Sequence, residues 1–318
     1  MTQGDVLCAG IVVADHVCAP IARMPTAGEL VMSDSMLLTL GGCAANVAVN
    51  LAKLGLAPWV VGRVGDDVWG RVLAQMLAEA GLETSGLTVT PGRLTSQTLI
   101  INVAGQDRRF IHHFGANADF TAADVDTDQV RRARLLYVGG YLLMARLEPE
   151  HLAELFTVAR SANVLTVLDV AVPSAGPWQA ALEKVLPLTD AFLPNQDEAA
   201  LILGESDPRQ QALRFREMGA RRVAITLGAE GVVWADERER WRAGTYPTQL
   251  VDASGGGDAF AAGLIHALLE DWPASACLRW GSALGASCVR AIGTTTGTFS
   301  RAEADIFIAQ HDLPLTPW

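Results

Sequence analysis

The sequence predicts an α/β protein in which helices cover both faces of a mostly parallel sheet. Three observations support this prediction. Short apolar runs alternate with helix-like segments through most of the 318 residues. Half of the residues are apolar and 19% are charged, which is ordinary for a globular enzyme. No repeat, low-complexity tract or linker divides the chain. Strand–helix alternation is typical of a parallel sheet covered on both sides, so we expect one α/β body.

The individual elements follow from apolar runs and from the residues that end them. Residues 5–13 (DVLCAGIVV) predict a buried strand, 44–55 a helix closed by a glycine, and 58–65 a second strand. Residues 69–81 predict a helix that also ends at a glycine. The remaining predicted strands span 133–140, 163–171, 190–195 and 221–228, and the remaining predicted helices span 149–162, 177–186, 207–219 and 259–269.

Two segments break the alternation. Residues 30–40 (LVMSDSMLLTL) and 96–114 (SQTLIINVAGQDRRFIHHF) read as extended chain without an intervening helix. The second segment has the pattern of a hairpin, with Gly105 and Asp107 as turn residues. Such a small β-layer is either an edge hairpin or a lid over the crevice at the strand ends. The pattern alone leaves both interpretations open.

Charge and cysteine content exclude several classes of protein. The net charge of −11 argues against a nucleic acid or an acidic membrane surface as partner. The five cysteines form no metal-type spacing and predict free thiols in a reducing compartment. We expect a cytoplasmic protein, because the N-terminus lacks the pattern of a signal peptide and no apolar run reaches membrane-spanning length. Lysine occurs only at Lys53 and Lys184, so no Gly-Lys-Ser/Thr of a P-loop exists.

The stretch VDASGGGDAFAAGLIHALL, residues 251–269, is the strongest candidate for a site. Gly255, Gly256 and Gly257 leave their amides unobstructed, and Asp258 lies at the start of a helix. One interpretation is a tight turn with Asp258 as the N-cap. The other is that the bare amides and the helix N-terminus bind an anion while Asp258 accepts a proton from a hydroxyl beside it. A structural turn needs one glycine and seldom three, which favours the second interpretation.

Other motifs are ambiguous when taken singly. Gly41 and Gly42 precede a helix that carries Asn46, either as a solvated cap or as a ligand for a hydroxyl. Asp15 ends an apolar run, where a carboxylate could hold two neighbouring hydroxyls or belong to a turn. The pair in PNQDE, Asn195 and Glu198, matches a capping box as well as a site for magnesium-bound water. Two further glycines and a threonine in TLGAEG allow contact with phosphates or form a hairpin turn; these are Thr226, Gly228 and Gly231.

The order of these motifs resembles the ribokinase-like (PfkB) family of carbohydrate and nucleoside kinases. GGCAANVAVNLAKLG, PNQDE, TLGAEG and DASGGGDAFAAGL carry the resemblance, which extends from GIVVADH to VRAIGT. It implies a three-layer α/β/α sandwich, with residues 1–318 as a single domain and a β-sheet lid formed by roughly 12–40 and 96–116. It also implies ATP-dependent phosphorylation of a hydroxyl on a small sugar, and in some members a homodimer formed through the lid.

The resemblance assigns roles residue by residue. Asp258 matches the family's catalytic base, and the amides of Gly255, Gly256 and Gly257 match its anion hole. Positions that hold the sugar are matched by Asp15, Gly42 and Asn46. The ATP–magnesium side is matched by Asn195, Glu198, Thr226, Gly228 and Gly231, with Glu198 reaching Mg²⁺ through water. A monovalent cation such as K⁺ is implied near Asp252, Ser254, Ala291 and Gly293, with Cys288 close by.

Two departures from the family pattern leave the substrate open. Gly256 replaces the alanine of the common G-A-G-D motif, and Cys43 stands where ribokinases proper have lysine. His112 and His113 end the lid hairpin, either as sugar contacts or as half-exposed strand residues. A nucleoside kinase is an alternative, although the lid is poor in aromatic residues. A silent sugar-binding regulator is disfavoured by the intact Asp258 and glycines, and a dinucleotide dehydrogenase by the absence of G-x-G-x-x-G after the first strand.

Overall fold

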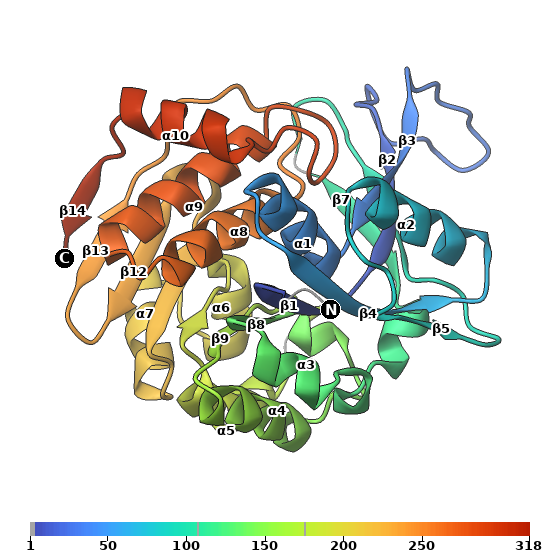
Figure 1. The fold of residues 1–318 in the computed structure, drawn as a ribbon. Coiled ribbons are helices and arrows are strands. Elements are labelled where there is room, and N and C mark those ends of the chain that lie inside the picture. Colours follow the sequence, from blue (N-terminus) through green and yellow to red (C-terminus); the bar gives the residue numbers. More distant parts are fainter. Residues whose placement is uncertain (1–3, 107, 175) are drawn as a thin grey trace.

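The computed structural model describes residues 4–106, 108–174 and 176–318, and a ten-stranded sheet forms its centre (Figure 1). From β11 to the β5 edge all neighbouring strands are parallel, whereas the three pairs beyond β11 are antiparallel. The strands in spatial order are β14 (Leu315–Pro317), β13 (Arg240–Ala243), β12 (Val232–Asp236), β11 (Arg222–Thr226), β10 (Ala191–Phe192), β9 (Leu165–Leu168), β8 (Leu135–Gly139), β1 (Val6–Gly10), β4 (Pro58–Gly65) and β5 (Leu87–Thr90).

Helices cover both faces of this sheet (Figure 1). One face packs against α1 (Cys43–Lys53), α2 (Val68–Glu79), α8 (Gly256–Leu269), α9 (Ala274–Cys288) and α10 (Arg301–Gln310). The other face packs against α3 (Thr127–Arg132), α4 (Pro149–Ser161), α5 (Trp178–Val185), α6 (Gln196–Leu203) and α7 (Pro208–Glu217). Side chains alternate along each strand, so Val6 and Cys8 join one core while Leu7 and Ala9 join the other. The predicted three-layer α/β/α fold is confirmed.

Short 3₁₀ turns complete the connections; they are η1 (Gly115–Asp119), η2 (Ala122–Asp124), η3 (Tyr141–Leu143), η4 (Leu186–Leu188) and η5 (Gly228–Glu230). The predicted helices at 44–55, 69–81, 149–162, 177–186, 207–219 and 259–269 correspond to α1, α2, α4, α5, α7 and α8. Their ends agree closely because glycine or proline marks most of them. No helix in the described part of the chain is long and apolar enough to cross a membrane.

The prediction of one strand over residues 5–13 was wrong. β1 ends at Gly10, and a separate strand β2 (Val13–Cys18) begins three residues later in another sheet. Gly10 has φ 141° and lies so close to β8 that a Cβ would come within 2.1 Å of the Gly139 carbonyl oxygen. The residues between the two sheets remain buried, so the apolar run continues through the break and hides it. Asp15 consequently lies within β2 and not at the end of a strand.

A second, four-stranded sheet projects from the body at the upper right of Figure 1. Its order is β3 (Met36–Gly41), β2, β6 (Gln97–Ile101) and β7 (Arg109–His113). The β2–β6 pair is parallel and the other two pairs are antiparallel. The expected hairpin within 96–114 is present, with Gly105 at positive φ in its loop, whereas Asp107 lies outside the described residues. Of the extended segment 30–40, only the part from Met36 onward is a strand. This sheet is called the small sheet below.

Candidate active site

The candidate site lies at the carboxyl edge of the central strands, where open α/β sheets bind their ligands. Asp169 directly follows β9, and Asn195 and Thr226 form an isolated bridge beyond β10 and at the end of β11. The N-terminus of α8 reaches the same edge, because the carboxylate oxygens of Asp169 and Asp258 and the Cys43 Sγ all lie within 4.8 Å of one another. The edge therefore gathers residues from the first, middle and last parts of the chain.

Each of the three glycines before Asp258 meets a different surrounding. Gly255 caps α8 in the left-handed region (φ 76°), and a Cβ there would come within 2.3 Å of the Thr294 carbonyl oxygen. A Cβ on Gly256 would approach Val289 Cγ1 to 3.3 Å. A Cβ on Gly257 would meet nothing within 4 Å. The first glycine is thus required by the fold, whereas the third leaves open space at the helix N-terminus, where the Gly256 amide lies 3.4 Å from the Ala253 carbonyl oxygen.

A residue of α1 hydrogen-bonds the Asp258 side chain. Asn46 Nδ2 donates a hydrogen bond of 2.7 Å to Asp258 Oδ2, and the Thr294 hydroxyl lies 2.8 Å from Asn46 Oδ1. Burial raises the pKa of Asp258 above its ordinary value, while hydrogen bonds from Asn46 and Cys43 lower it. Hydrogen-bond donors therefore fix the orientation of the Asp258 side chain from one side. A carboxylate held in this way is suited to accept a proton.

Asp169 is a site residue that the sequence analysis missed. It is buried, and the Tyr137 hydroxyl donates a 2.8 Å hydrogen bond to its Oδ2. Burial raises the pKa of Asp169 well above its usual range, and the nearby Glu198 and Asp258 raise it further. The available signal was its place at the end of a predicted strand, in NVLTVLDVA, the same kind of position as Asn195. Without a glycine or a recognised motif beside it, that signal was weak.

Asp15 belongs to a row of polar residues across the small sheet. The strand registers place Thr39, Asp15, Thr98 and His112 side by side on successive strands. Thr98 Oγ1 lies 3.0 Å from His112 Nδ1 and also hydrogen-bonds the Asp15 carboxylate. Burial, followed by the charges of Asp258 and Asp252, raises the pKa of Asp15 to about 7 despite the Thr98 hydrogen bond.

The same polar row accounts for the different exposure of His112 and His113 and for the need for glycine at position 41. His112 is partly buried and tied to Asp15 through Thr98, whereas His113 is exposed. A Cβ on Gly41 would come within 2.0 Å of Asp15 Oδ2, so the carboxylate packs directly on that backbone. Gly42, the N-cap of α1, has φ 89°, and a Cβ there would meet the Ile11 carbonyl oxygen at 2.4 Å. The Gly-Gly pair thus lets α1 and the small sheet approach each other.

Asn195 and Glu198 form the capping box of α6. Asn195 accepts from the Glu198 amide and Glu198 accepts from the Asn195 amide, each at 2.9 Å. Glu198 also lies near Asp258, because the charge of Asp258 adds to the effect of burial in raising the pKa of Glu198 to about 8. The two interpretations of this motif are therefore compatible: the capping box fixes the side chain that is a candidate for water-mediated metal binding.

The motif that contains Thr226, Gly228 and Gly231 forms the turn between β11 and β12. Thr226 ends β11, and η5 occupies residues 228–230. A Cβ on Gly231 would come within 2.1 Å of the Ala243 carbonyl oxygen, so the hairpin itself requires this glycine. Gly228 has φ 57°, and a Cβ added there would meet nothing within 4 Å. In this second respect it resembles Gly257. Of the two glycines, Gly228 is therefore the one with open space for a ligand, and Thr226 lies beside it at the end of β11.

The predicted cation residues come together in two adjoining loops. The Asp252 carboxylate accepts from the Ser254 amide at 2.9 Å and from the Gly293 amide at 3.0 Å. Cys288 Sγ lies 3.5 Å from the Ser254 carbonyl oxygen and 3.2 Å from that of Thr294. The Ala291 amide bonds the Cys288 carbonyl. Asp252 thus joins the segment before the three glycines to the loop after α9.

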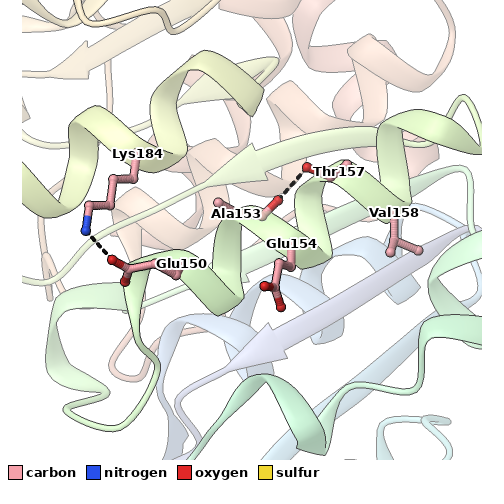
Figure 2. A pocket seen from close by; sticks show the side chains of 6 residues that line it. All are labelled: Glu150, Ala153, Glu154, Thr157, Val158 and Lys184. Carbon is pink, nitrogen blue, oxygen red and sulfur yellow. Dashed lines mark hydrogen bonds and ion pairs between the residues drawn. The ribbon is translucent and has the colours of Figure 1, made fainter.

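A separate surface hollow lies over α4 and α5, in the helical layer opposite α8 (Figure 2). It contains an ion pair between Lys184 and Glu150, and the Thr157 hydroxyl donates to the Ala153 carbonyl. Figure 2 shows that its remaining lining residues are Glu154 and Val158. None of the predicted site residues lines this hollow, and its one lysine is paired with Glu150, so we assign the chemistry to the Asp258 edge.

The three-layer fold, the small sheet and the glycine turn before a half-buried aspartate define a kinase of the ribokinase-like class. The chain belongs to the pfkB family of carbohydrate kinases, whose model matches residues 3–300. The family and the enzyme class predicted from the sequence are thereby confirmed.

Individual known proteins are similar over nearly the whole chain. A 5-dehydro-2-deoxygluconokinase from Geobacillus kaustophilus is 26% identical over 296 residues, which cover 88% of each chain. The structure of Arabidopsis thaliana ribokinase complexed with ribose and ATP has a TM-score of 0.81 at 22% identity, covering 98% of this chain and 100% of that one. A Burkholderia thailandensis nucleoside kinase in complex with inosine has a TM-score of 0.77 at 21% identity, covering 96% and 98%. At these identities the two structures establish the shared fold alone.

Proposed function

We propose that this protein transfers the γ-phosphoryl group of ATP to a hydroxyl of a small sugar, with Asp258 as general base. The observation that carries the proposal is the placement of Asp258. Its carboxylate is directed by Asn46 and stands at the N-terminus of α8, beside the open space in front of Gly257. A base beside an anion-binding helix terminus is what phosphoryl transfer to an alcohol requires.

In this mechanism the protein contributes a base, a set of amide donors and a site that positions the sugar. Asp258 accepts the proton of the sugar hydroxyl while that oxygen forms a bond to the γ-phosphorus and the bond to the β-phosphate oxygen breaks. The amides of Gly255, Gly256 and Gly257 donate to the phosphoryl oxygens, where negative charge is concentrated. Preorganised donors of this kind contribute on the order of 10²–10³ in turnover each.

The nucleotide side of the proposal rests on the residues at the ends of β10 and β11. Gly228 offers open space for phosphates beside Thr226, and the capping box fixes the Glu198 side chain. Glu198 is the residue we assign to Mg²⁺, through water. The donor chemistry fits, because Mg²⁺ prefers carboxylate oxygens and the Glu198 carboxylate is fixed by the Asn195 amide at 2.9 Å. When bound, Mg²⁺ neutralises phosphate charge.

The sugar side is the polar row of the small sheet. We assign Asp15 and Asn46 to sugar hydroxyls, with His112 acting through Thr98. Gly42 serves by letting the backbone approach, since its Cβ position is filled by Ile11. In this proposal the small sheet is the lid, and its closure excludes water from the reacting groups.

A nucleoside kinase is the second candidate. The similarity in fold to a nucleoside kinase permits it, and Phe110 and Phe114 of the small sheet are exposed aromatic rings on which a base could stack. The row from Thr39 to His112 suits the hydroxyls of a sugar or of a ribose, and the scarcity of aromatic residues in the small sheet favours a sugar.

The decisive experiment measures ADP formed from ATP and Mg²⁺ against a panel of sugars, sugar acids and nucleosides. Asp258→Asn keeps the shape of the side chain and removes the base, so we expect turnover to fall on the order of 10²–10⁴-fold with nucleotide binding retained. Undiminished activity in this variant would contradict the role of Asp258. A preference for nucleosides would replace the sugar by the second candidate.

A homodimer formed through the small sheet is a further part of the proposal. Its segments expose large apolar side chains, among them Leu30 at 85%, Met32 at 79% and Met36 at 69%. Strands β3 and β7 are the edges of this sheet within the described residues, and exposed edges readily pair with another copy. Met36→Glu should shift the sedimentation coefficient of the protein to that of a monomer, whereas a wild type that sediments as a monomer would refute the dimer.

We also propose that a monovalent cation such as K⁺ binds beside Asp252, Ser254, Ala291 and Gly293. The donor set fits, because carboxylate and backbone carbonyl oxygens are hard ligands and the Ser254 amide is tied to the Asp252 carboxylate. KCl should raise the melting temperature above that in tetramethylammonium chloride at equal ionic strength. Asp252→Asn should remove the difference.

A further inference from the structure

Arg108 joins the small sheet to the glycine turn. It lies in the loop between β6 and β7, and its Nη1 donates a hydrogen bond of 3.1 Å to Ser254 Oγ. Ser254 directly precedes Gly255, so the guanidinium stands beside the first of the three glycine amides. The Arg108 Cζ also lies 5.4 Å from the centre of the ring of Phe110 in the following strand β7, and this contact supports the Arg108 side chain.

Arg108 brings a positive charge to a site that is otherwise lined by acidic side chains. Asp15, Asp169, Glu198 and Asp258 crowd the site, and each has a pKa raised by burial. Among the contacts recorded for the described residues, Arg108 is the cationic side chain that touches the segment 252–258. A phosphoryl group brought into this acidic surrounding needs a positive partner from the protein besides the helix N-terminus.

We propose that Arg108 binds the phosphoryl group in transfer, as a guanidinium carried by the small sheet to the glycine turn. This inference rests on the proposed function and adds a residue to it. A guanidinium presents a planar fork of N–H donors that matches two phosphate oxygens at once, and it stays protonated throughout the reaction. Arg108 therefore takes no part in the proton balance and stabilises the charge spread over the phosphoryl oxygens.

The placement on the small sheet couples substrate enclosure to chemistry. Asp258 and the glycine amides lie at the N-terminus of α8. The Arg108 guanidinium, in contrast, is carried by the loop between β6 and β7 of the small sheet. The full set of charges is assembled only when the loop that contains Arg108 lies against Ser254. Arg108 thereby acts on turnover more than on ground-state affinity for the sugar.

The test compares Arg108→Ala and Arg108→Lys with the matched control Arg109→Ala. Arg109 is the next residue, is exposed and donates to the Gln106 side chain. We expect kcat of Arg108→Ala to fall about 100-fold or more, as for loss of one transition-state donor. The KM for the sugar should change less than about threefold. Arg108→Lys should be intermediate, guanidine in solution should partly rescue Arg108→Ala, and Arg109→Ala should retain wild-type kcat.

A second measurement needs no turnover. ADP with Mg²⁺ and fluoroaluminate mimics the phosphoryl group in transfer, and its stabilisation of the protein against heat is compared with that of ADP and Mg²⁺ alone. Arg108→Ala should lose the extra stabilisation and Arg109→Ala should keep it. Equal stabilisation in all three proteins, or a raised sugar KM with unchanged kcat, would overturn the inference. A wild type that neither forms ADP nor is stabilised by ATP would instead overturn the proposed function.

Discussion

Asn46 Nδ2 lies 2.7 Å from Asp258 Oδ2, and this hydrogen bond joins two glycine motifs separated by 212 positions in the chain. The first motif turns the chain into α1 and the second turns it into α8, and the two helices pack together. The N–H of an amide stabilises the ionised form of a carboxyl group. The bond therefore both directs Asp258 and opposes the effect of its burial.

The first prediction concerns Asn46→Ala. Loss of the donor should raise the pKa of Asp258 further, so the acid limb of the kcat/KM profile should move to higher pH. The activity deficit should then be larger at pH 6 than at pH 8.5. The measurement is the full pH profile of the variant beside the wild type. A uniform loss across the range would mean that Asn46 contributes to binding alone.

The second prediction concerns Asp15, whose pKa is raised to about 7. An ionised carboxylate accepts hydrogen bonds from two hydroxyls, so sugar affinity should increase as pH rises from 6 to 8. Asp15→Asn cannot ionise and should bind the sugar more weakly, with no such pH dependence. Isothermal titration calorimetry of sugar binding to both proteins at several pH values tests this prediction. A variant that keeps the wild-type slope would assign the titration to another group.

The third prediction separates the roles of the glycines. Gly255→Ala forces a side chain into the left-handed region and against the Thr294 carbonyl, so it should lower the free energy of unfolding by about 1–3 kcal/mol. Gly257→Ala meets no atom of the fold and should leave the melting temperature unchanged or slightly higher. Its activity should nevertheless fall, because the new methyl group enters the space in front of the amides.

Urea unfolding and ADP assays on the two variants decide this prediction. Gly256→Ala is the natural comparison, since its Cβ meets only the flexible Val289 side chain at 3.3 Å. This variant should remain active. An active Gly257→Ala protein of normal stability would show that the space before α8 receives no ligand.

The fourth prediction concerns His266 in α8. This histidine is fully buried between Trp272 and Trp280, and burial lowers its pKa below 6.5. The unfolded chain then binds a proton that the folded chain does not, so His266 reduces the free energy of unfolding as pH falls below about 6.5. Buried carboxyl groups with raised pKa values increase the free energy of unfolding as pH falls, which opposes the effect of His266. The effect of His266 must therefore be measured as the difference in free energy of unfolding between the wild type and a variant that lacks the histidine.

That comparison is between the wild type and His266→Leu, unfolded in urea at pH 7.5, 6 and 5. The free energy of unfolding of the variant should improve relative to the wild type toward pH 5. A constant difference across the three pH values would show that the His266 ring does not resist protonation.

The sequence predicted most of the fold because helices and buried strands have different periodicities and glycine ends many helices. It failed at residues 11–13, where both sides of the break are buried and the apolar run gives no sign of it. It also left the strands beyond β11 undescribed, because short edge strands such as β14 have little apolar pattern.

The sequence marked the glycines that the backbone requires, as at Gly42 and Gly255, whereas their roles toward a ligand stay predictions. Asp169 was missed because an isolated aspartate after a strand has many structural uses, and only the fold places it beside Asp258. Arg108 was missed for the same reason. Its contact with Ser254 spans 146 positions and depends on how two sheets face each other, which no local pattern encodes.

The packing of α1 against α8 also bears on how this enzyme is made. Contacts between segments far apart in sequence form slowly during folding. A nascent chain on the ribosome carries the segments of Asp15 and Asn46 early, but Asp258 emerges only when most of the polypeptide has been synthesised. In the proposed mechanism, prematurely terminated copies that end before α8 therefore lack the general base, and such fragments should form ADP from ATP far more slowly than the full chain.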